Sequence, residues 1–394
     1  METGRIQLFP HGGWKKPIVM KPLRVMATFG TRPEAIKLAP VIQLLKEDKR
    51  FKALVVVTAQ HREMLDQVLD VFSIKPDRDL DLMKRNQDLA SLTASIFTHF
   101  DPVLREMKPD WLLIQGDTTT AMAAALNAYY RRIKIGHVEA GLRTGNKWQP
   151  FPEEINRRIA ATLADLHFAP TDWARNNLLN EGIPESAIEV TGNTIIDALN
   201  QIVKSAPPKK IQQFLTEKKI KEDGKKLIVV TAHRRENFGK PINDICRAIR
   251  TIAQQNKDNV EIIYPVHLNP NIQQPVHSTL DGIDNITLLP PLEYVSLVHL
   301  LKHTYMILTD SGGIQEEATG LGIPCLVLRD VTERPEGVEA GILKIVGTET
   351  DKIVKESKTI LSNADVHAAM AKAANPYGDG KAAQRIVSFL SGMD

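Results

Sequence analysis

Short apolar runs alternate with helical patterns along most of this chain of 394 residues. The first half carries apolar runs at 23–29, 53–58, 111–115, 133–138 and 166–169, with helical patterns at 35–46, 89–107, 121–130 and 172–180. The second half repeats the alternation, with apolar runs at 227–231, 260–264, 286–288, 305–309 and 323–328. Such alternation predicts a parallel sheet with helices on both faces. Because it occurs twice over similar lengths, we expect an α/β protein of two Rossmann-like, doubly wound domains facing a cleft.

The halves meet at residues 189–193, so the predicted N-terminal domain covers 23–190 and the predicted C-terminal domain covers 191–376. Residues 1–22 have neither a continuous apolar core nor a small-residue cleavage site, and we interpret them as an N-terminal extension. A final amphipathic helix is predicted at 381–390, and residues 377–394 are expected to pack back onto the body of the protein.

Composition and short motifs argue against several classes of partner and cofactor. The net charge of +3 gives no case for a nucleic-acid or membrane partner. Two cysteines far apart in sequence exclude a disulfide framework and suit the cytoplasm. The scattered histidines lack metal-ligand spacing, so we expect no metal. Neither half has the G-x-G-x-x-G or P-loop pattern, which counts against dinucleotide cofactors and P-loop chemistry.

An apolar run ending at Thr309 leads into a Ser-Gly-Gly turn and then a helix. Gly312 has no Cβ, so its backbone N–H can approach a ligand closely, and Ser311 can donate its hydroxyl. Such a helix start favours a phosphate group, because free N–H groups and the helix dipole point at the anion. Glu317, one turn further on, can accept from sugar hydroxyls. The alternative for this stretch is an ordinary helix N-cap without a ligand.

Other polar residues follow the predicted strands, where ligands bind in open α/β sheets. Arg32 and Lys37 follow the first strand, Asp117 the third, Glu139 the fourth, and His233 the first strand of the second half. Each has a structural alternative: an exposed basic pair, a helix cap for Asp117, a salt bridge for Glu139, and a structural role for the isolated histidine. Taken singly, none of these residues decides between the alternatives.

Two acidic residues, Glu153 and Glu154, open the helix that starts after Pro152. Acidic side chains favour the first turn of a helix because they complement its dipole. We therefore expect one of the two carboxylates to be structural and leave the other available for chemistry.

Several segments match one family when they are read together. They are GTRPEAIK at 30–37, QGDTTT at 115–120, HVEAGLRT at 137–144, PEE at 152–154, TAHRREN at 231–237, DSGGIQEE at 310–317 and TERPE at 332–336. From about residue 23 to residue 390 the chain resembles the non-hydrolysing UDP-N-acetylglucosamine 2-epimerases of bacteria and archaea. The order and spacing of these segments make the resemblance specific.

The resemblance implies a glycosyltransferase-B-like fold whose last helix crosses back to the first domain. It implies reversible conversion of UDP-GlcNAc to UDP-ManNAc, without a redox cofactor, for cell-surface polysaccharide precursors. It also implies a homodimer and, in bacterial members, activation by UDP-GlcNAc at a second site near Gln60, Arg62 and Glu63.

The family pattern assigns two groups of site residues. Those at the catalytic centre are Asp117, Glu139, Glu153 and His233. Those around UDP are Arg32, Lys37, Ser311, Gly312, Glu317 and Arg334. The chain departs from the pattern at Leu292 and Leu297, where many members carry a polar residue and an aromatic residue near the uracil, which leaves the base contacts open.

The chemistry explains why cations and carboxylates are needed together. The C2 proton of the sugar is weakly acidic, so loss of UDP from C1, giving a glycal, is the plausible first stage, followed by re-addition with the proton on the other face. Cations and the helix end would hold the developing negative charge, and one such donor is worth roughly 3 kcal/mol. We interpret Asp117 as the base, with Glu139 and Glu153 as its partners, whose separate roles the sequence leaves open. His233 is expected either to join this chemistry or to neutralise the diphosphate. Holding both fragments requires a cleft that closes.

Three other functions remain open at this stage. A hydrolysing epimerase begins with the same elimination but releases UDP and free ManNAc. A glycosyltransferase of the same fold needs an acceptor and has less use for three acidic groups on the first domain. A non-catalytic UDP-sugar sensor is compatible with the fold, since fold does not determine function.

Overall fold

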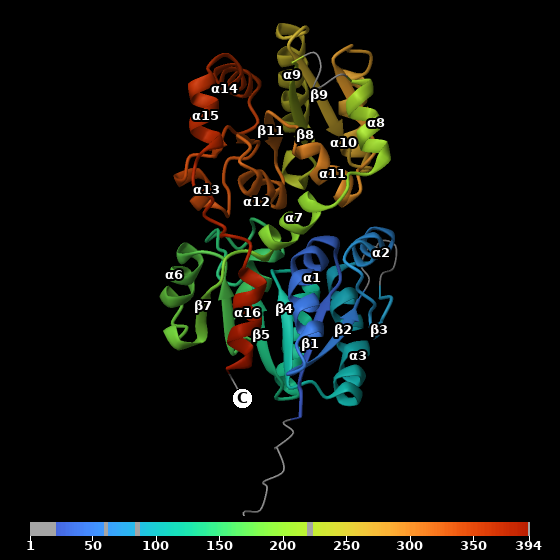
Figure 1. Ribbon diagram of the computed structural model, residues 1–394, viewed down its shortest axis with the longest axis vertical. Coiled ribbons are helices and arrows are strands. Elements are labelled where there is room, and N and C mark those ends of the chain that lie inside the picture. The colour runs from blue at the N-terminus through green and yellow to red at the C-terminus, as the bar shows by residue number, and fades with distance from the viewer. Residues whose placement is uncertain (1–20, 59–61, 83–86, 219–223, 393–394) are drawn as a thin grey trace, which may run out of the picture.

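The computed structural model describes residues 21–58, 62–82, 87–218 and 224–392. It contains two parallel β-sheets, one built from each half of the chain, with helices packed on both faces (Figure 1). The predicted α/β class with two Rossmann-like units is therefore confirmed. The exact division between residues 190 and 191 stays a prediction.

The first sheet is seven-stranded, in the order β3-β2-β1-β4-β5-β6-β7. Its strands are β1 (Leu23–Phe29), β2 (Phe51–Val57), β3 (Arg78–Asp79), β4 (Trp111–Gln115), β5 (Lys134–Val138), β6 (Leu166–Ala169) and β7 (Ile188–Val190). The helices of this half are α1 (Arg32–Glu47), α2 (Arg62–Val71), α3 (Leu89–Met107), α4 (Thr119–Tyr130), α5 (Glu153–Leu163) and α6 (Asp172–Asn180). Alternate residues of β1 face two separate cores: Val25 packs with α1 and α2, and Met26 packs with α3 and α4. Burial on both faces explains the continuous apolar runs.

The second sheet is six-stranded, in the order β10-β9-β8-β11-β12-β13. Its strands are β8 (Lys226–Thr231), β9 (Val260–Pro265), β10 (Ile286–Leu289), β11 (Met306–Thr309), β12 (Cys325–Val327) and β13 (Leu343–Ile345). Its helices are α9 (Lys240–Gln255), α10 (Pro270–Leu280), α11 (Tyr294–Leu301), α12 (Gly312–Leu321), α13 (Pro335–Glu339), α14 (Thr350–Ser362) and α15 (Ala364–Ala371). The helices α9, α10 and α14 cover one face, and α11 and α12 cover the other.

Three short strands were not predicted: β3, β7 and β13. Each has two or three residues, which is too few to show a period of two. They form at the edges of the sheets, where pairing with one neighbouring strand is enough to define them. The exposed segment after residue 204 contains one further helix, α8 (Lys209–Glu217).

The chain crosses between the halves twice, and the two crossings touch. After β7 it enters α7 (Thr194–Lys204), and it returns through Tyr377 to the last helix, α16 (Ala382–Ser391). The backbone N–H of Asn193 donates to the Tyr377 carbonyl at 2.8 Å. A Cβ on Gly378 would lie 3.2 Å from the Cα of Gly192, so the two connections are in backbone contact.

The returning helix α16 lies on the first sheet beside α1, although it follows the second sheet in sequence (Figure 1). Its first N–H groups, on Ala382 and Ala383, donate to the Asp197 carboxylate of α7 at 3.2 and 3.0 Å. This carboxylate satisfies N–H groups that have no partner within the helix and also complements the helix dipole. The contact ties both crossings to the first half.

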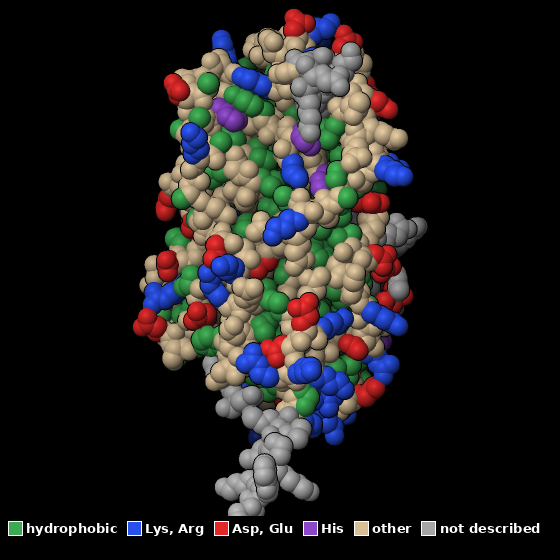
Figure 2. All heavy atoms as spheres, in the orientation of Figure 1, with side chains coloured by type: hydrophobic (Ala, Val, Ile, Leu, Met, Phe, Trp, Pro, Cys, Tyr) green, Lys and Arg blue, Asp and Glu red, His purple; other side chains and the backbone are tan. Residues whose placement is uncertain are grey.

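No helix in the described part of the chain is long and apolar enough to cross a membrane. Lys, Arg, Asp and Glu side chains are interspersed over the face seen in Figure 2, without one dominant patch of a single sign.

The turn after β5 depends on one glycine, Gly141, which has a φ of +90°. A Cβ at this position would lie 2.2 Å from the carbonyl oxygen of Ala174, a backbone atom of α6 that cannot rotate away. Gly182 is a matched control, because its φ is +84° and nothing lies within 4 Å of an added Cβ.

We expect both Gly141→Ala and Gly182→Ala to lose about 1–2 kcal/mol from left-handed backbone strain. Gly141→Ala should lose a further ~1–3 kcal/mol from the backbone clash. Urea denaturation of the two variants and the wild type measures the difference. Equal losses in both variants would contradict the close contact between this turn and α6.

Candidate active site

Polar residues from both sheets meet where the carboxyl ends of their strands converge. The first sheet contributes Lys37 from α1 and Glu139 from the end of β5. The second contributes Glu316 from α12 and Arg334 from the turn before α13. These four residues bring the two halves of the chain into ionic contact.

Lys37 is the centre of this contact. Its Nζ contacts Oε2 of Glu139 and lies 2.9 Å from Oε2 of Glu316. The other oxygen of Glu316 lies 2.7 Å from Nη2 of Arg334 and accepts from its Nε at 2.8 Å. No side chain in this chain of charges is more than 7% exposed. Buried charges persist only when they are paired in this way.

The pKa values of Glu139 and Glu316 shift in opposite directions. Burial raises the pKa of Glu139, and its contact with Lys37 opposes this shift only in part. Burial acts on Glu316 in the same direction, but Arg334 and Lys37 together hold the pKa of that carboxyl below its usual range. Two cations thus stabilise the ionised form of Glu316, whereas Glu139 is more easily protonated than an ordinary glutamate.

Glu139 also has an unusual backbone, with a φ of +64°. This left-handed conformation costs a residue other than glycine about 1–2 kcal/mol, and such strain is concentrated at functional sites. Its carboxylate accepts a hydrogen bond from Nδ2 of Asn193 at 3.1 Å. Its other oxygen would lie 3.9 Å from a Cβ on Gly116, so this carboxylate reaches the turn that presents Asp117.

The first turn of α5 separates two adjacent carboxylates into different environments. Glu154 is fully buried and accepts from the backbone N–H groups of Thr144 and Gly145 at 3.1 and 3.2 Å. One oxygen of Glu153 is buried and has no hydrogen-bond partner among the described residues. Burial raises the pKa of Glu153, and the neighbouring Asp117 raises it further. Glu154 is therefore a structural residue, and Glu153 is available for chemistry.

Asp117 lies after β4 and contacts the guanidinium of Arg157, a buried residue of α5. The Asp117 side chain is 25% exposed, so its carboxylate is accessible from the cleft. Asn156 donates to the Asp117 carbonyl at 3.0 Å and holds the turn. The helix α5 therefore holds Asp117 through Asn156 and Arg157, and it carries Glu153 in its first turn.

The amino end of α12 is open to an anion. Ser311 is the N-cap residue, but its side chain makes no capping hydrogen bond. A Cβ on Gly312 would lie 2.4 Å from Nη1 of Arg334, so glycine lets this guanidinium approach the helix end. Arg32 donates to the carbonyl of Leu292 across the cleft at 3.4 Å. Free N–H groups and a nearby guanidinium suit a phosphate.

Glu317 lies one turn into α12 and is buried. One of its carboxylate oxygens has no hydrogen-bond partner in the described part of the protein. Burial raises the pKa of Glu317 to about 7, while Arg32 opposes the shift. The carboxylate therefore lacks the donors that it would need as a purely structural residue.

His233 follows β8 and faces the same cleft, with its side chain 39% exposed. Its ring stacks on that of His267, with centroids 5.3 Å apart and planes at 14°. Burial lowers the pKa of His233, and Asp310 opposes the shift.

Three sequence-predicted residues are not placed at this site. Gln60 lies outside the described residues. Arg62 and Glu63 begin α2, but their side chains also lie outside the description. The described part of the chain contains no group of three or more His, Cys, Asp or Glu side chains able to hold a metal ion.

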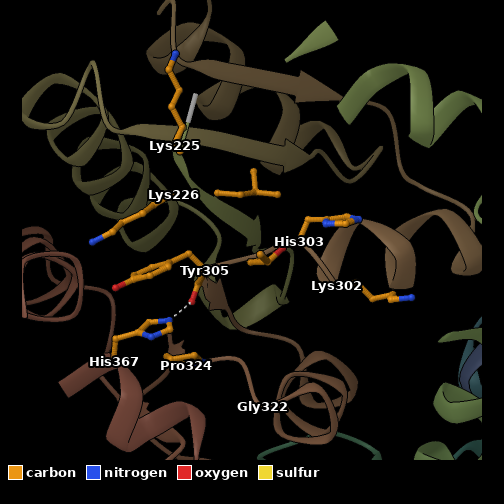
Figure 3. Close-up of a pocket in the computed structure, with 11 residues that line it drawn as sticks. Lys225, Lys226, Lys302, His303, Tyr305, Gly322, Pro324 and His367 are labelled. Atoms are coloured by element: carbon orange, nitrogen blue, oxygen red, sulfur yellow. Dashed lines mark hydrogen bonds between the residues drawn. The ribbon is translucent and has the colours of Figure 1, made fainter. Parts of the chain in front are cut away.

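One cavity borders the elements of this site, and a second lies away from them. One of about 240 Å³ lies between α2 and α11 and is lined by Arg32 and Tyr294. Another of about 410 Å³ opens at the opposite, amino-terminal edge of the second sheet (Figure 3). In the latter, Lys226 donates to the Leu361 carbonyl at 2.5 Å, and His367 bonds the Tyr305 carbonyl at 2.9 Å. Its polar groups thus serve local structure.

Sequence reasoning missed the residues that support the site: Asn193, Asp310, Glu316 and, in α5, Arg157. Their contacts join segments far apart in sequence, for example 54 residues in the bond from Asn193 to Glu139. A local signal existed only for Asp310, which directly follows a strand as Asp117 does.

Comparisons with known proteins point to one family. The family model described as UDP-N-acetylglucosamine 2-epimerase matches residues 43–391. The UDP-N-acetylglucosamine 2-epimerase of Bacillus subtilis is 50% identical over 371 residues, covering 94% of this chain and 96% of that protein. The Escherichia coli K12 enzyme of the same name is 50% identical over 372 residues, covering 93% and 98%. The crystal structure of the Neisseria meningitidis UDP-GlcNAc 2-epimerase bound to UDP-GlcNAc has a TM-score of 0.88 and 46% identity, covering 94% and 100%.

Two facing Rossmann-like sheets, with carboxylates on one side of the cleft and an anion-binding helix end on the other, define an enzyme of glycosyltransferase-B-like fold that acts on nucleotide sugars. Within that class the two relatives cover 93–94% of this chain. The chain belongs to the UDP-N-acetylglucosamine 2-epimerase family.

The two neighbouring glutamates of α12 should affect stability with opposite pH dependence. Burial raises the pKa of Glu317 to about 7, above its ordinary value of 4.5. The unfolded chain releases this proton first, so a pH rise from about 4.5 to about 7 favours unfolding. Relative to Glu317→Gln, the wild type should therefore lose free energy of unfolding across this range, as measured by urea denaturation.

Glu316→Gln is the matched control. The pKa of Glu316 is lowered, so its ionised form stabilises the fold above the ordinary glutamate pKa, and this stability is lost as the pH falls. The stability difference between the wild type and Glu316→Gln should grow as the pH rises from the acid side. The same slope in both variants would contradict the different environments of the two carboxylates.

Proposed function

We propose that this protein interconverts UDP-GlcNAc and UDP-ManNAc by reversible epimerisation at C2, through elimination of UDP to a glycal and re-addition, without hydrolysis. The observation that carries the proposal is the convergence of Asp117, Glu139 and Glu153 with the Lys37–Glu316–Arg334 ion pairs in one cleft. Relatives named UDP-N-acetylglucosamine 2-epimerase at 50% identity support the substrate.

Departure of UDP needs positive charge at the diphosphate. The amino end of α12, at Ser311 and Gly312, supplies backbone N–H groups, and Arg334 lies against it. Arg32 and Lys37 face them from the first half of the chain. An electrostatic donor of this kind typically contributes about 3 kcal/mol to transition-state stabilisation. Because the diphosphate is bound by both halves, we expect the cleft to close on it.

Proton transfer at C2 needs a base and an acid with different proton affinities. Asp117 contacts the guanidinium of Arg157 and is partly exposed, and we assign it as the base. Burial raises the pKa of Glu153, so this residue is suited to carry the proton that is delivered during re-addition. Glu139, which contacts Lys37, is their partner and links proton transfer to the diphosphate side of the cleft. His233 acts at the diphosphate.

The ribose is assigned to Glu317, whose buried oxygen has no partner among the described residues and can accept from the two vicinal hydroxyls. Tyr294 of α11 lies next to this carboxylate. Burial and the nearby Glu317 carboxylate both raise the pKa of the Tyr294 hydroxyl. Elimination and re-addition move a proton and break and re-form the C1–O bond without any hydride transfer, so the proposed route requires no redox cofactor.

The family resemblance carries three further proposals. The protein acts in the cytoplasm, forms a homodimer, and is activated by UDP-GlcNAc at a second site near Gln60, Arg62 and Glu63. Sedimentation analysis of the full chain addresses the dimer, and the dependence of rate on UDP-GlcNAc concentration addresses the activation.

The proposed reaction is tested by proton NMR of the protein with UDP-GlcNAc alone in D₂O. We expect UDP-ManNAc to appear, with deuterium at C2 of both sugars, because the C2 proton exchanges with solvent while the glycal is bound. Formation of UDP and free ManNAc would indicate a hydrolysing epimerase instead. An unchanged spectrum would indicate a transferase that lacks its acceptor or a UDP-sugar sensor.

Glu153 and Glu154 form a matched pair for separating chemistry from structure. Glu153→Gln should lower kcat about 10²–10⁴-fold, the usual contribution of a positioned acid, with little change in thermal stability. Glu154→Gln should instead lower the free energy of unfolding by about 1–3 kcal/mol, because two backbone N–H groups and Arg157 lose their carboxylate partner. Steady-state rates and thermal melts of both variants check this. A large loss of stability in Glu153→Gln would contradict its assignment.

A further inference from the structure

Asp310 lies directly after β11 and is completely buried, next to the loop that carries His233. Its Oδ2 accepts three hydrogen bonds: from the backbone N–H of His233 and of Arg234, both at 2.8 Å, and from Nδ2 of Asn237 at 2.9 Å. One carboxylate oxygen therefore fixes the backbone of the loop after β8.

The other oxygen of Asp310 has a different environment. Oδ1 is buried and has no hydrogen-bond partner among the described residues. Nδ1 of His233 lies 3.8 Å from this oxygen. This distance is too long for a hydrogen bond, but a small rotation of the ring would bring the two atoms within bonding distance. Catalytic hydrogen bonds are often long in a free enzyme and shorten when the ligand binds.

The ring of His233 is held from two sides. The His267 ring stacks on one face, and Asp310 lies at the Nδ1 edge. The other charged groups that act on the ring are Arg234, from the same loop, and Arg32, from α1 across the cleft. Asp310 is the one carboxylate among these groups, so it alone favours the imidazolium over the neutral ring.

We propose that Asp310 is a positioning residue that orients His233 and keeps the proton on Nδ1, so that Nε2 is presented to the diphosphate. The identity of the anion rests on the function proposed above, whereas the pairing of Asp310 with His233 does not. Oδ2 already accepts three donors, which leaves Oδ1 to accept Nδ1–H. The other ring nitrogen is then free to donate to a phosphate oxygen when the ring is protonated. The same carboxylate thus anchors the loop and sets the tautomer of its histidine.

The pairing can be measured without enzyme turnover, by nitrogen-15 NMR of the full-length protein labelled at histidine. In the wild type we expect neutral His233 to carry its proton on Nδ1. In Asp310→Asn the amide oxygen can keep the three donors of the loop while the NH₂ group faces the ring. The proton should then move to Nε2, and the pKa of His233 should fall by about one unit or more, since a nearby opposite charge is lost.

Asp77→Asn is the matched control, because Asp77 also accepts a backbone N–H, that of Val55 at 2.7 Å, but lies at the far edge of the first sheet. It should leave the tautomer and pKa of His233 unchanged. Addition of UDP should raise the pKa of His233 in the wild type and in Asp77→Asn, and raise it less in Asp310→Asn.

The measurement on the wild type also guards against a variant that does not fold. A neutral His233 protonated on Nε2 in the wild type would overturn the proposal without any substitution. A folded Asp310→Asn with an unchanged pKa and tautomer would overturn it as well. If the expected pairing is found but UDP-GlcNAc is not epimerised, the proposed function fails and the role of Asp310 stands.

Discussion

The buried ion pairs around Lys37 are the constraint on which the two-part structure depends. Charges removed from water are strongly destabilising unless opposite charges lie beside them. Lys37 meets Glu316 of the other half, and Glu316 in turn meets Arg334. Because neither half can bury its part of this chain of charges alone, the sheets must face each other at their carboxyl ends. The cations that we assign to the diphosphate are therefore held in place before any ligand arrives.

The two halves of the chain contribute different chemical groups to the cleft. The carboxylates of Asp117, Glu139 and Glu153 all come from the first sheet and from α5. The anion-binding helix end and Arg334 come from the second. Burial raises the pKa values of Glu139 and Glu153, and Asp117 contacts the guanidinium of Arg157. In the proposed reaction the groups for proton transfer and those for leaving-group stabilisation therefore come from different halves of the chain.

The connection between the halves reaches the same cleft. Asn193 bonds the Tyr377 carbonyl through its backbone and the Glu139 carboxylate through its side chain. An added Cβ on Gly192 or Gly378 would lie only 3.2 Å from backbone atoms of the other crossing, so the two crossings are tightly packed. A relative rotation of the halves therefore acts directly on Glu139, whose backbone is already strained. This geometry links the crossings between the halves to the position of one carboxylate.

The sequence by itself determined the alternation of strands and helices, the family, and most residues of the cleft, because apolar periodicity and short motifs are local in the chain. It predicted β4 and α6 to the residue but not β3, β7 and β13, which exist only through pairing with neighbours. Its helix pattern left open which of Glu153 and Glu154 is structural, and only the family resemblance assigned Glu153 to the catalytic centre. Only the tertiary structure decided that Glu154 holds a turn, that Glu316 joins Lys37 to Arg334, and that Asp310 faces His233. Burial and charge pairing depend on residues distant in sequence, and folding alone brings them together.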